Sequence, residues 1–166
     1  GPVLQPAYKS FVGMHSIPVV HGLTVGELAQ MINGEGWLEK KQPCRLTIVK
    51  MLHYTHNTIT APEEKPSPNL PNLLSIRLYP SLCWFEGTDI SVARGTLFPF
   101  QAIGYPDQRM GSFTFTPRSI DDMSKNPPQK DNVCFGIDLR TKDVGHRMTL
   151  EYLLDLQPYL LFLLLS

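Results

Sequence analysis

The sequence predicts an α+β fold with a small mixed sheet, a few helices and long proline-rich loops. One segment combines helix-capping residues with helical apolar spacing, and several short segments are rich in β-branched and aromatic residues. The fifteen prolines among 166 residues favour turns and extended connections over a helical bundle. A chain of this length can bury a core as one domain without a metal or a disulfide framework.

The clearest helix is predicted at residues 24–33. Thr24 is suited to the N-cap, and Glu27 follows three residues later, which together make a capping box. Gly34 and Gly36 then end the helix. The apolar stripe of this helix consists of Leu23, Val25, Leu28, Met31 and Ile32.

Four short segments are predicted as strands. They are the β-branched run 46–51, the apolar run 82–85, and residues 113–116 and 134–140. A short helix is expected from residue 73 to just before Pro80, because proline disrupts a helix interior. Residues 53–72, rich in proline and asparagine, predict a long ordered loop or a lid.

The C-terminal region is predicted as a packed helix over 150–156 followed by an irregular apolar tail over 157–166. Pro158 interrupts the apolar run, and residues 160–165 are too few to cross a bilayer, so we expect no transmembrane segment. The chain opens on Gly-Pro-Val-Leu without a basic, apolar leader, so no targeting signal is visible in it.

Composition argues against several kinds of ligand. Lys and Arg number fifteen, as do Asp and Glu, so bulk electrostatics does not predict nucleic-acid binding. Cys44, Cys83 and Cys134 are far apart and lack a CxxC pair, which argues against a zinc site or a redox dithiol and leaves their redox state open. His53 and His56 lack further ligands nearby in sequence, so we predict neither a metal nor a cofactor.

The densest polar cluster lies in "YPSLCWFEGTDISVARGTLFPF", residues 79–100. Glu86 follows an apolar run directly, where a half-buried carboxylate can gain a raised pKa suited to proton transfer. The alternative is a structural ion pair with Arg94. No GxSxG, HExxH, P-loop or GxGxxG pattern occurs in the chain.

Arg94, Gly95 and Thr96 supply a planar cation, a backbone that tolerates close approach, and a hydroxyl. These groups suit a ligand carboxylate or sugar hydroxyls. A turn arginine paired with Glu86 or Asp89 is an equally good interpretation of the same residues.

Several stretches in order carry a family resemblance. They are "GPVLQPAYKSFVGMHSIPVVHGLTVGELAQMIN", "CRLTIVKM", "PSPNLPNL", "YPSLCWFEGTDISVARGTLFPFQAIGYP" and "FTFTPRSI". From Gly1 to about Asp155 the chain resembles the C-terminal half of the NamZ-type exo-β-N-acetylmuramidase family. The resemblance implies exported cell-wall glycosidases, periplasmic or extracellular, that release N-acetylmuramic acid from the non-reducing ends of peptidoglycan fragments.

The resemblance also implies two lobes. Residues 1–156 would be the smaller C-terminal α+β lobe, and a Rossmann-like N-terminal lobe would be missing from this chain. Family carboxylates lie mainly in that other lobe, one of them in a Gly-Pro-Glu-His-Gly-like stretch that this sequence lacks. We therefore expect the fragment alone to be inactive.

The predicted partner is a peptidoglycan-derived saccharide. We assign a catalytic role to Glu86 and substrate-binding roles to Arg94, Gly95, Thr96, Thr88, Ser91 and Asn69. A family segment rich in aromatic residues retains only Tyr54 in "HYTHNTITAPEEK", so that part of the substrate rim differs. Two alternatives stay open: a non-catalytic glycan-binding or interaction domain that uses the same Arg-Gly-Thr surface, and a purely structural domain.

Overall fold

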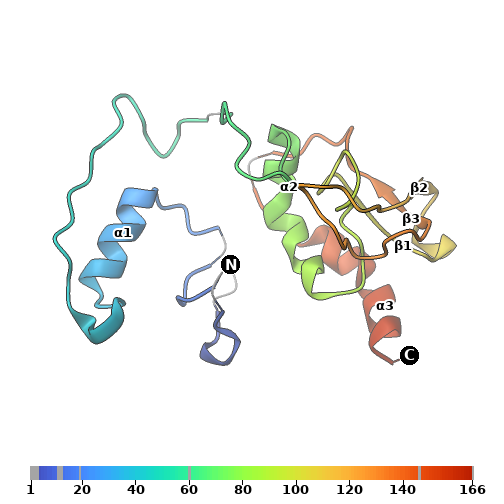
Figure 1. Cartoon of the computed structure of the whole chain (residues 1–166), viewed down its shortest axis with the longest axis horizontal. Coiled ribbons are helices and arrows are strands. Elements are labelled where there is room, and N and C mark those ends of the chain that lie inside the picture. The colour runs from blue at the N-terminus through green and yellow to red at the C-terminus, as the bar shows by residue number, and fades with distance from the viewer. Residues whose placement is uncertain (1–3, 11–12, 19, 60, 146, 166) are drawn as a thin grey trace. The chain divides into compact units, whose positions relative to one another are not determined.

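The computed structural model describes residues 4–10, 13–18, 20–59, 61–145 and 147–165, with side chains described up to residue 159. The chain divides into two compact units, residues 1–60 (unit 1) and 61–166 (unit 2). Figure 1 shows the elements of each. No helix in the described part is long and apolar enough to cross a membrane.

Unit 1 is built around helix α1, Val25–Gly34. Its capping box is present: Thr24 Oγ1 accepts from the Glu27 backbone N–H at 3.2 Å, and Glu27 Oε2 accepts from the Thr24 backbone N–H at 2.8 Å. These bonds satisfy amides that a helix start leaves unpaired. The predicted helix at 24–33 is confirmed to within one residue.

The strand predicted at 46–51 is wrong for this chain. Residues 42–50 have no regular secondary structure, although Figure 1 shows an extended backbone in the part of the chain that follows α1. A strand exists only through hydrogen bonds to a neighbouring strand. Nothing in the described part of unit 1 supplies that neighbour.

Unit 2 begins its regular structure with helix α2, Leu73–Leu82, whose N-cap Asn72 forms a capping box with Ser75. The helix runs through Pro80 and passes directly into a 3₁₀ helix, Cys83–Gly87. The prediction that the helix ends before Pro80 is therefore wrong, and so is the strand at 82–85.

Burial in this region follows a helical repeat. Leu78, Leu82 and Phe85 are almost completely buried, and their spacing of four and three residues places them on one side of a helix. A short apolar run cannot by itself distinguish a strand from a buried helical turn. Packing of this apolar side accounts for the continuation past Pro80.

The sheet consists of β1 (Ala102–Tyr105), β2 (Phe113–Phe115) and β3 (Cys134–Asp138), in the order β1-β3-β2. Both pairings are antiparallel, with Ile103 opposite Ile137 and Thr114 opposite Phe135. The strands predicted near 113–116 and 134–140 are confirmed, and β1 was not predicted. The sheet is antiparallel and not mixed, while the α+β class is confirmed.

The larger of two hydrophobic clusters joins α2 and β1 with α3, Glu151–Leu165, and a smaller one contains Ala93, Ala102, Phe115 and Cys134. The helix continues through the segment predicted as an irregular tail, so that expectation is corrected. Tyr159 packs on the core and its hydroxyl donates to the Arg109 carbonyl at 2.8 Å, which holds the helix beyond residue 156. The buried residues of the larger cluster are Leu78, Leu82, Phe85, Ile90, Val92, Phe100, Ile103, Met110, Leu139 and Leu156.

Candidate functional site

Glu86 and Arg94 form an ion pair at the surface of unit 2, with Arg94 Nη2 donating to Glu86 Oε1. Each side chain keeps about a third of its surface exposed, 32% for Glu86 and 31% for Arg94. The Arg94 guanidinium carbon lies 5.1 Å from the centroid of the Phe100 ring, a cation–π distance. The two residues predicted as acid and anion binder are thus brought together.

Tyr79 belongs to the same neighbourhood. Its ring meets the Phe100 ring edge-on, with centroids 5.0 Å apart. Burial first, and then the negative charge of Glu86, raise the pKa of Tyr79, while Arg94 lowers it. The Tyr79 hydroxyl forms no hydrogen bond within the described part of the chain.

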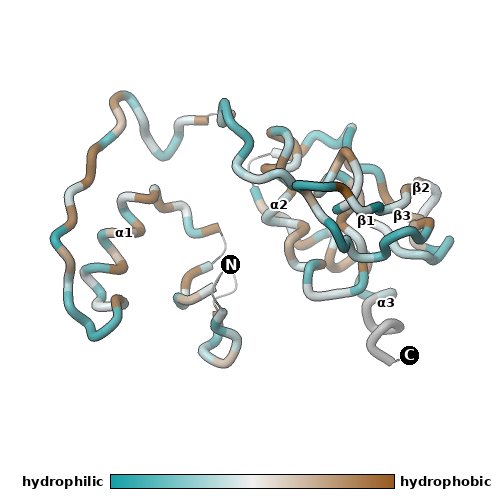
Figure 2. Tube along the Cα trace, viewed as in Figure 1, coloured by the Kyte–Doolittle hydropathy of each residue, from teal (hydrophilic) through white to brown (hydrophobic). Residues whose placement is uncertain are grey.

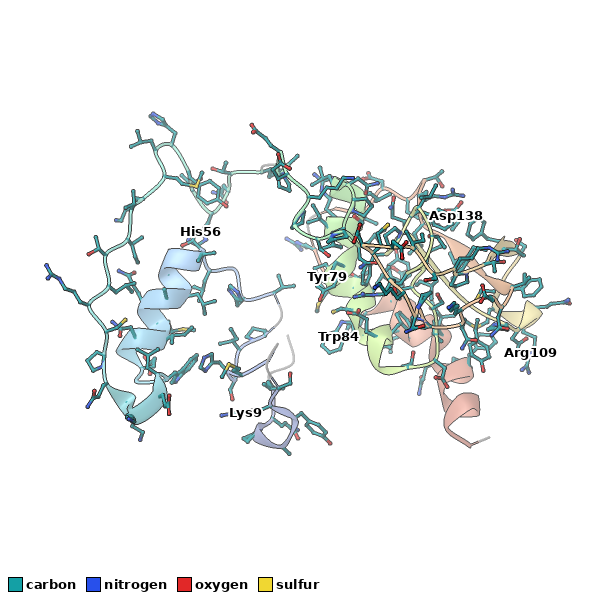
Figure 3. All side chains as sticks on the ribbon, in the orientation of Figure 1. Lys9, His56, Tyr79, Trp84, Arg109 and Asp138 are labelled. Carbon is teal, nitrogen blue, oxygen red and sulfur yellow. The ribbon has the colours of Figure 1, made fainter. Side chains whose placement is uncertain are left out.

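Sequence reasoning missed Tyr79 because it treated Leu82–Phe85 as a strand. In the helical path of α2 and the following 3₁₀ helix, positions 79, 83 and 86 are spaced for one face. Figure 3 shows Tyr79 and Trp84 along this stretch. Burial and the Glu86 charge also raise the pKa of the Cys83 thiol, which places Cys83 near the same carboxylate.

The hydroxyls of Thr88, Ser91 and Thr96, which the sequence predicts as saccharide contacts, bond the backbone of residues 85–93. Thr88 Oγ1 donates to the Phe85 carbonyl at 2.8 Å, and Thr96 Oγ1 donates to the Ala93 carbonyl at 2.8 Å. Ser91 is fully buried, and its Oγ accepts from the Ala93 amide at 3.2 Å. Their assignment as saccharide contacts stays a prediction.

Asn69 lies in a turn before α2 and is mostly buried. Its Nδ2 donates to the Met123 carbonyl at 2.9 Å, while its buried Oδ1 has no hydrogen-bond partner. The structure therefore gives Asn69 a role in joining two loops of unit 2. Its role in substrate binding also stays a prediction.

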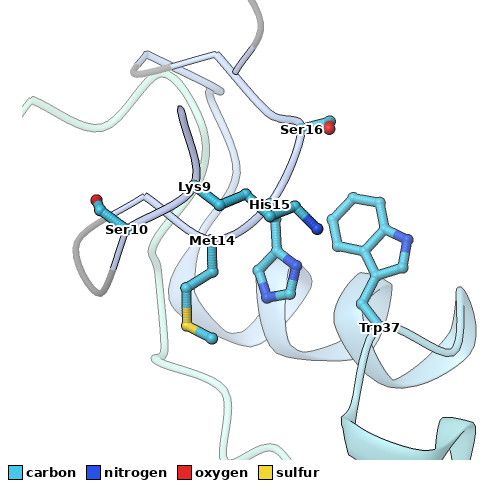
Figure 4. Close-up of a pocket in the computed structure, with 6 residues that line it drawn as sticks. All are labelled: Lys9, Ser10, Met14, His15, Ser16 and Trp37. Atoms are coloured by element: carbon cyan, nitrogen blue, oxygen red, sulfur yellow. The ribbon is translucent and has the colours of Figure 1, made fainter. Parts of the chain in front are cut away.

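Two hollows lie elsewhere. In unit 1, a hollow of about 450 Å³ is lined by Lys9, Ser10, Met14, His15, Ser16 and Trp37. Figure 4 shows the His15 and Trp37 rings, which stack with centroids 5.0 Å apart. A smaller one of about 140 Å³ lies between residues 61–66 and 70–76 of unit 2. Neither is lined by Glu86 or Arg94.

The described residues contain no group of three or more His, Cys, Asp or Glu side chains placed to hold a metal ion. His56 Nε2 lies 3.0 Å from Glu27 Oε1, in a contact within unit 1. The three cysteines are free, and burial raises the pKa of Cys134 to about 11. A thiol with so high a pKa is a poor nucleophile near neutral pH.

Two family models match the chain in succession. The one described as "Exo-beta-N-acetylmuramidase NamZ, N-terminal" matches residues 1–74, and the corresponding C-terminal one matches residues 77–155. The chain belongs to the NamZ family. The NamZ resemblance drawn from the sequence is thereby confirmed.

The peptidoglycan β-N-acetylmuramidase NamZ of Bacillus subtilis (strain 168) is 44% identical over 110 residues, which cover 64% of this chain and 26% of that protein. A crystal structure of a DUF1343-family protein from Bacteroides fragilis NCTC 9343 is 46% identical, with a TM-score of 0.88 over 93% of this chain and 45% of that one. This NamZ chain therefore spans less than half the length of both relatives.

A second DUF1343-family crystal structure from the same organism is 24% identical, with a TM-score of 0.74 over 98% of this chain and 48% of that one. At this identity the likeness supports the fold alone. The two NamZ models meet near residue 75, whereas the compact units meet at residue 60. Our placement of a single C-terminal lobe at 1–156 stays a prediction.

Proposed function

We propose that this chain is the substrate-side part of a peptidoglycan glycosidase that releases terminal N-acetylmuramic acid from non-reducing ends. Membership of an exo-β-N-acetylmuramidase family is the observation that carries the proposal. The longer protein would also contain a Rossmann-like N-terminal lobe that holds the principal acid. We further propose that it is exported, since peptidoglycan lies outside the cytoplasmic membrane.

Hydrolysis of a glycosidic bond usually needs two carboxyl groups on either side of that bond, about 5 to 10 Å apart. Glu86 is the carboxylate of this site: it pairs with Arg94, and its charge raises the pKa of Tyr79. About a third of its side-chain surface is exposed. It would act as one of the two groups, or would orient the other, with the second supplied from outside this chain. The fragment alone should then be inactive.

Arg94 is suited to the feature that distinguishes muramic acid from glucosamine, the lactyl carboxylate. A guanidinium binds a carboxylate through parallel N–H donors, and here the Glu86 carboxylate occupies one of them. We propose that a substrate carboxylate exchanges with Glu86 on Arg94 and releases Glu86 toward the sugar. The Tyr79 hydroxyl would be a further donor at the same place.

The test uses a family-length chimera, in which the N-terminal part of the 46%-identical B. fragilis protein is joined to this chain at Gly1. We expect Arg94→Lys to reduce the preference for muramic-acid over glucosamine glycosides by about 10- to 100-fold in kcat/KM. Arg118→Lys is the matched control, because Arg118 makes an exposed pair with Asp131. Unchanged discrimination in Arg94→Lys would remove the arginine from the proposal.

A further inference from the structure

The described part of unit 1 has no buried core. No described side chain between residues 4 and 59 is buried, whereas unit 2 buries Leu82, Phe85 and Phe100 completely. Aliphatic side chains instead face solvent, among them Val49 at 91% and Leu52 at 86% exposure. Figure 2 shows apolar residues recurring along the extended segment that follows α1. So much exposed apolar surface marks an incomplete packing unit.

Residues 44–48 already pack against helix α1. Asn33, near the end of α1, exchanges two hydrogen bonds with the Cys44 backbone: its Oδ1 accepts from Cys44 N at 2.7 Å and its Nδ2 donates to Cys44 O at 3.0 Å. Near the start of α1, a Cβ added to Gly26 would lie 2.9 Å from Ile48 Cγ2. Residues 44–48 therefore run back along the helix.

The sequence of this segment is that of a strand covered on both sides. In an extended backbone Leu46 and Ile48 point to one face and Val49 and Met51 to the other, so each face carries apolar side chains beside a few polar ones. Such runs are typical of strands in parallel sheets, which helices cover on either face. Ile48 meets α1, while Val49 and Met51 are 91% and 71% exposed.

The backbone of the segment is also unpaired. Among the backbone hydrogen bonds of the described chain, none involves residues 45–52. These peptide groups are thus free to accept neighbouring strands, which exposed strand edges readily do.

We propose that residues 44–52 form a strand within a sheet of the longer protein, and that α1 covers one face of that sheet. The occupant of both free edges is the part of a family-length NamZ protein that this chain lacks. The comparison with relatives supports this partner. The chain aligns with a solved relative at a TM-score of 0.88 but covers only 45% of it, and residues 1–74, which include this segment, match the N-terminal family model.

Hydrogen exchange tests the proposal directly. In the family-length chimera we expect amides 45–51 to exchange at least about 100-fold more slowly than in the 166-residue chain, because strand hydrogen bonds protect amides. Equal rates in the two proteins would overturn the proposal. Protection in the 166-residue chain that rises with its concentration would assign the edges to a second copy, and would also overturn it.

A substitution in two contexts gives an independent readout. Val49→Asp should lower the Tm of the chimera by about 5 °C or more and leave that of the 166-residue chain unchanged, because only the chimera would bury this side chain. Leu97→Asp is the matched control, since Leu97 is an 85% exposed leucine of unit 2. Equal losses for the two variants in the chimera contradict the proposal. Neither measurement uses substrate, so both are independent of the glycosidase activity.

Discussion

Gly95 has a φ of +78°, and a Cβ added to it would lie 2.4 Å from the Arg118 carbonyl oxygen and 2.5 Å from Pro127 Cγ. Its own carbonyl accepts from the Arg118 amide at 2.8 Å. The sequence predicts Gly95 as part of a ligand loop, because glycine permits close approach. The close approach is made by another loop of the same unit, which a single sequence does not reveal.

We expect Gly95→Ala to destabilise unit 2 by about 2 to 4 kcal/mol, because the added methyl group meets both backbone strain and overlap. Gly87→Ala is the control, since an added Cβ there meets nothing within 4 Å, and its effect should stay within about 0.5 kcal/mol. Denaturant unfolding measures both. Similar free energies of unfolding for the two variants would contradict the packing described at Gly95.

The Glu86 charge can be tested through Tyr79. We expect Glu86→Gln to lower the pKa of Tyr79, because a neighbouring negative charge opposes ionisation of the phenol and Arg94 favours it. Tyr152 is an internal control, because its pKa is raised by burial and by Glu151. NMR titration of both tyrosines measures the change. A Tyr79 pKa that does not move, or moves only together with that of Tyr152, argues against a shared neighbourhood.

At the scale of elements, local signals predicted α1 well and the region after α2 poorly. The Thr24–Glu27 capping box acts within four residues, so sequence alone identifies it. The path from Leu82 to Phe85 depends on which core receives these side chains, and an apolar run carries no such information. Recognition of the helix would have placed Tyr79 beside Glu86. Strand β1, with Gly104 in its centre, gave no propensity signal.

The start of α1 makes a prediction about pH. Thr24 and His56 lower the pKa of Glu27 to about 2, and Glu27 raises the pKa of His56 above its ordinary value of 6.5. The His56 contribution to stability is present below pH 6.5 and is lost as pH rises through its raised pKa. The Glu27 contribution is present above its ordinary value of 4.5 and is lost as pH falls towards about 2.

NMR titration of His56 measures this coupling. We expect Glu27→Gln to shift the pKa of His56 back toward 6.5, because the amide keeps the capping geometry and removes the charge. His15 stacks on Trp37 in the same unit and serves as the reference histidine. An unchanged His56 titration would show that the contact with Glu27 does not form in solution.

At the scale of the whole molecule, the α+β class and the family followed from the sequence, whereas the pairing of strands did not. The predicted strand at 46–51 has the right composition and lacks a partner in this chain. Of the proposed site residues, Glu86 and Arg94 form an ion pair. The hydroxyls of Thr88, Ser91 and Thr96 bond the nearby backbone, and Gly95 packs closely against another loop. Hydroxyl residues in turns can bond the nearby backbone or a ligand, so sequence could not separate these roles.

We propose that this chain supplies the substrate side of a muramidase whose principal acid lies elsewhere. Turnover of a chromogenic N-acetylmuramic acid glycoside, measured for the 166-residue chain and for the family-length chimera at equal concentration, tests it most directly. We predict turnover by the chimera and none above background by the chain. Turnover by the chain alone would place the principal acid within these 166 residues and contradict the account.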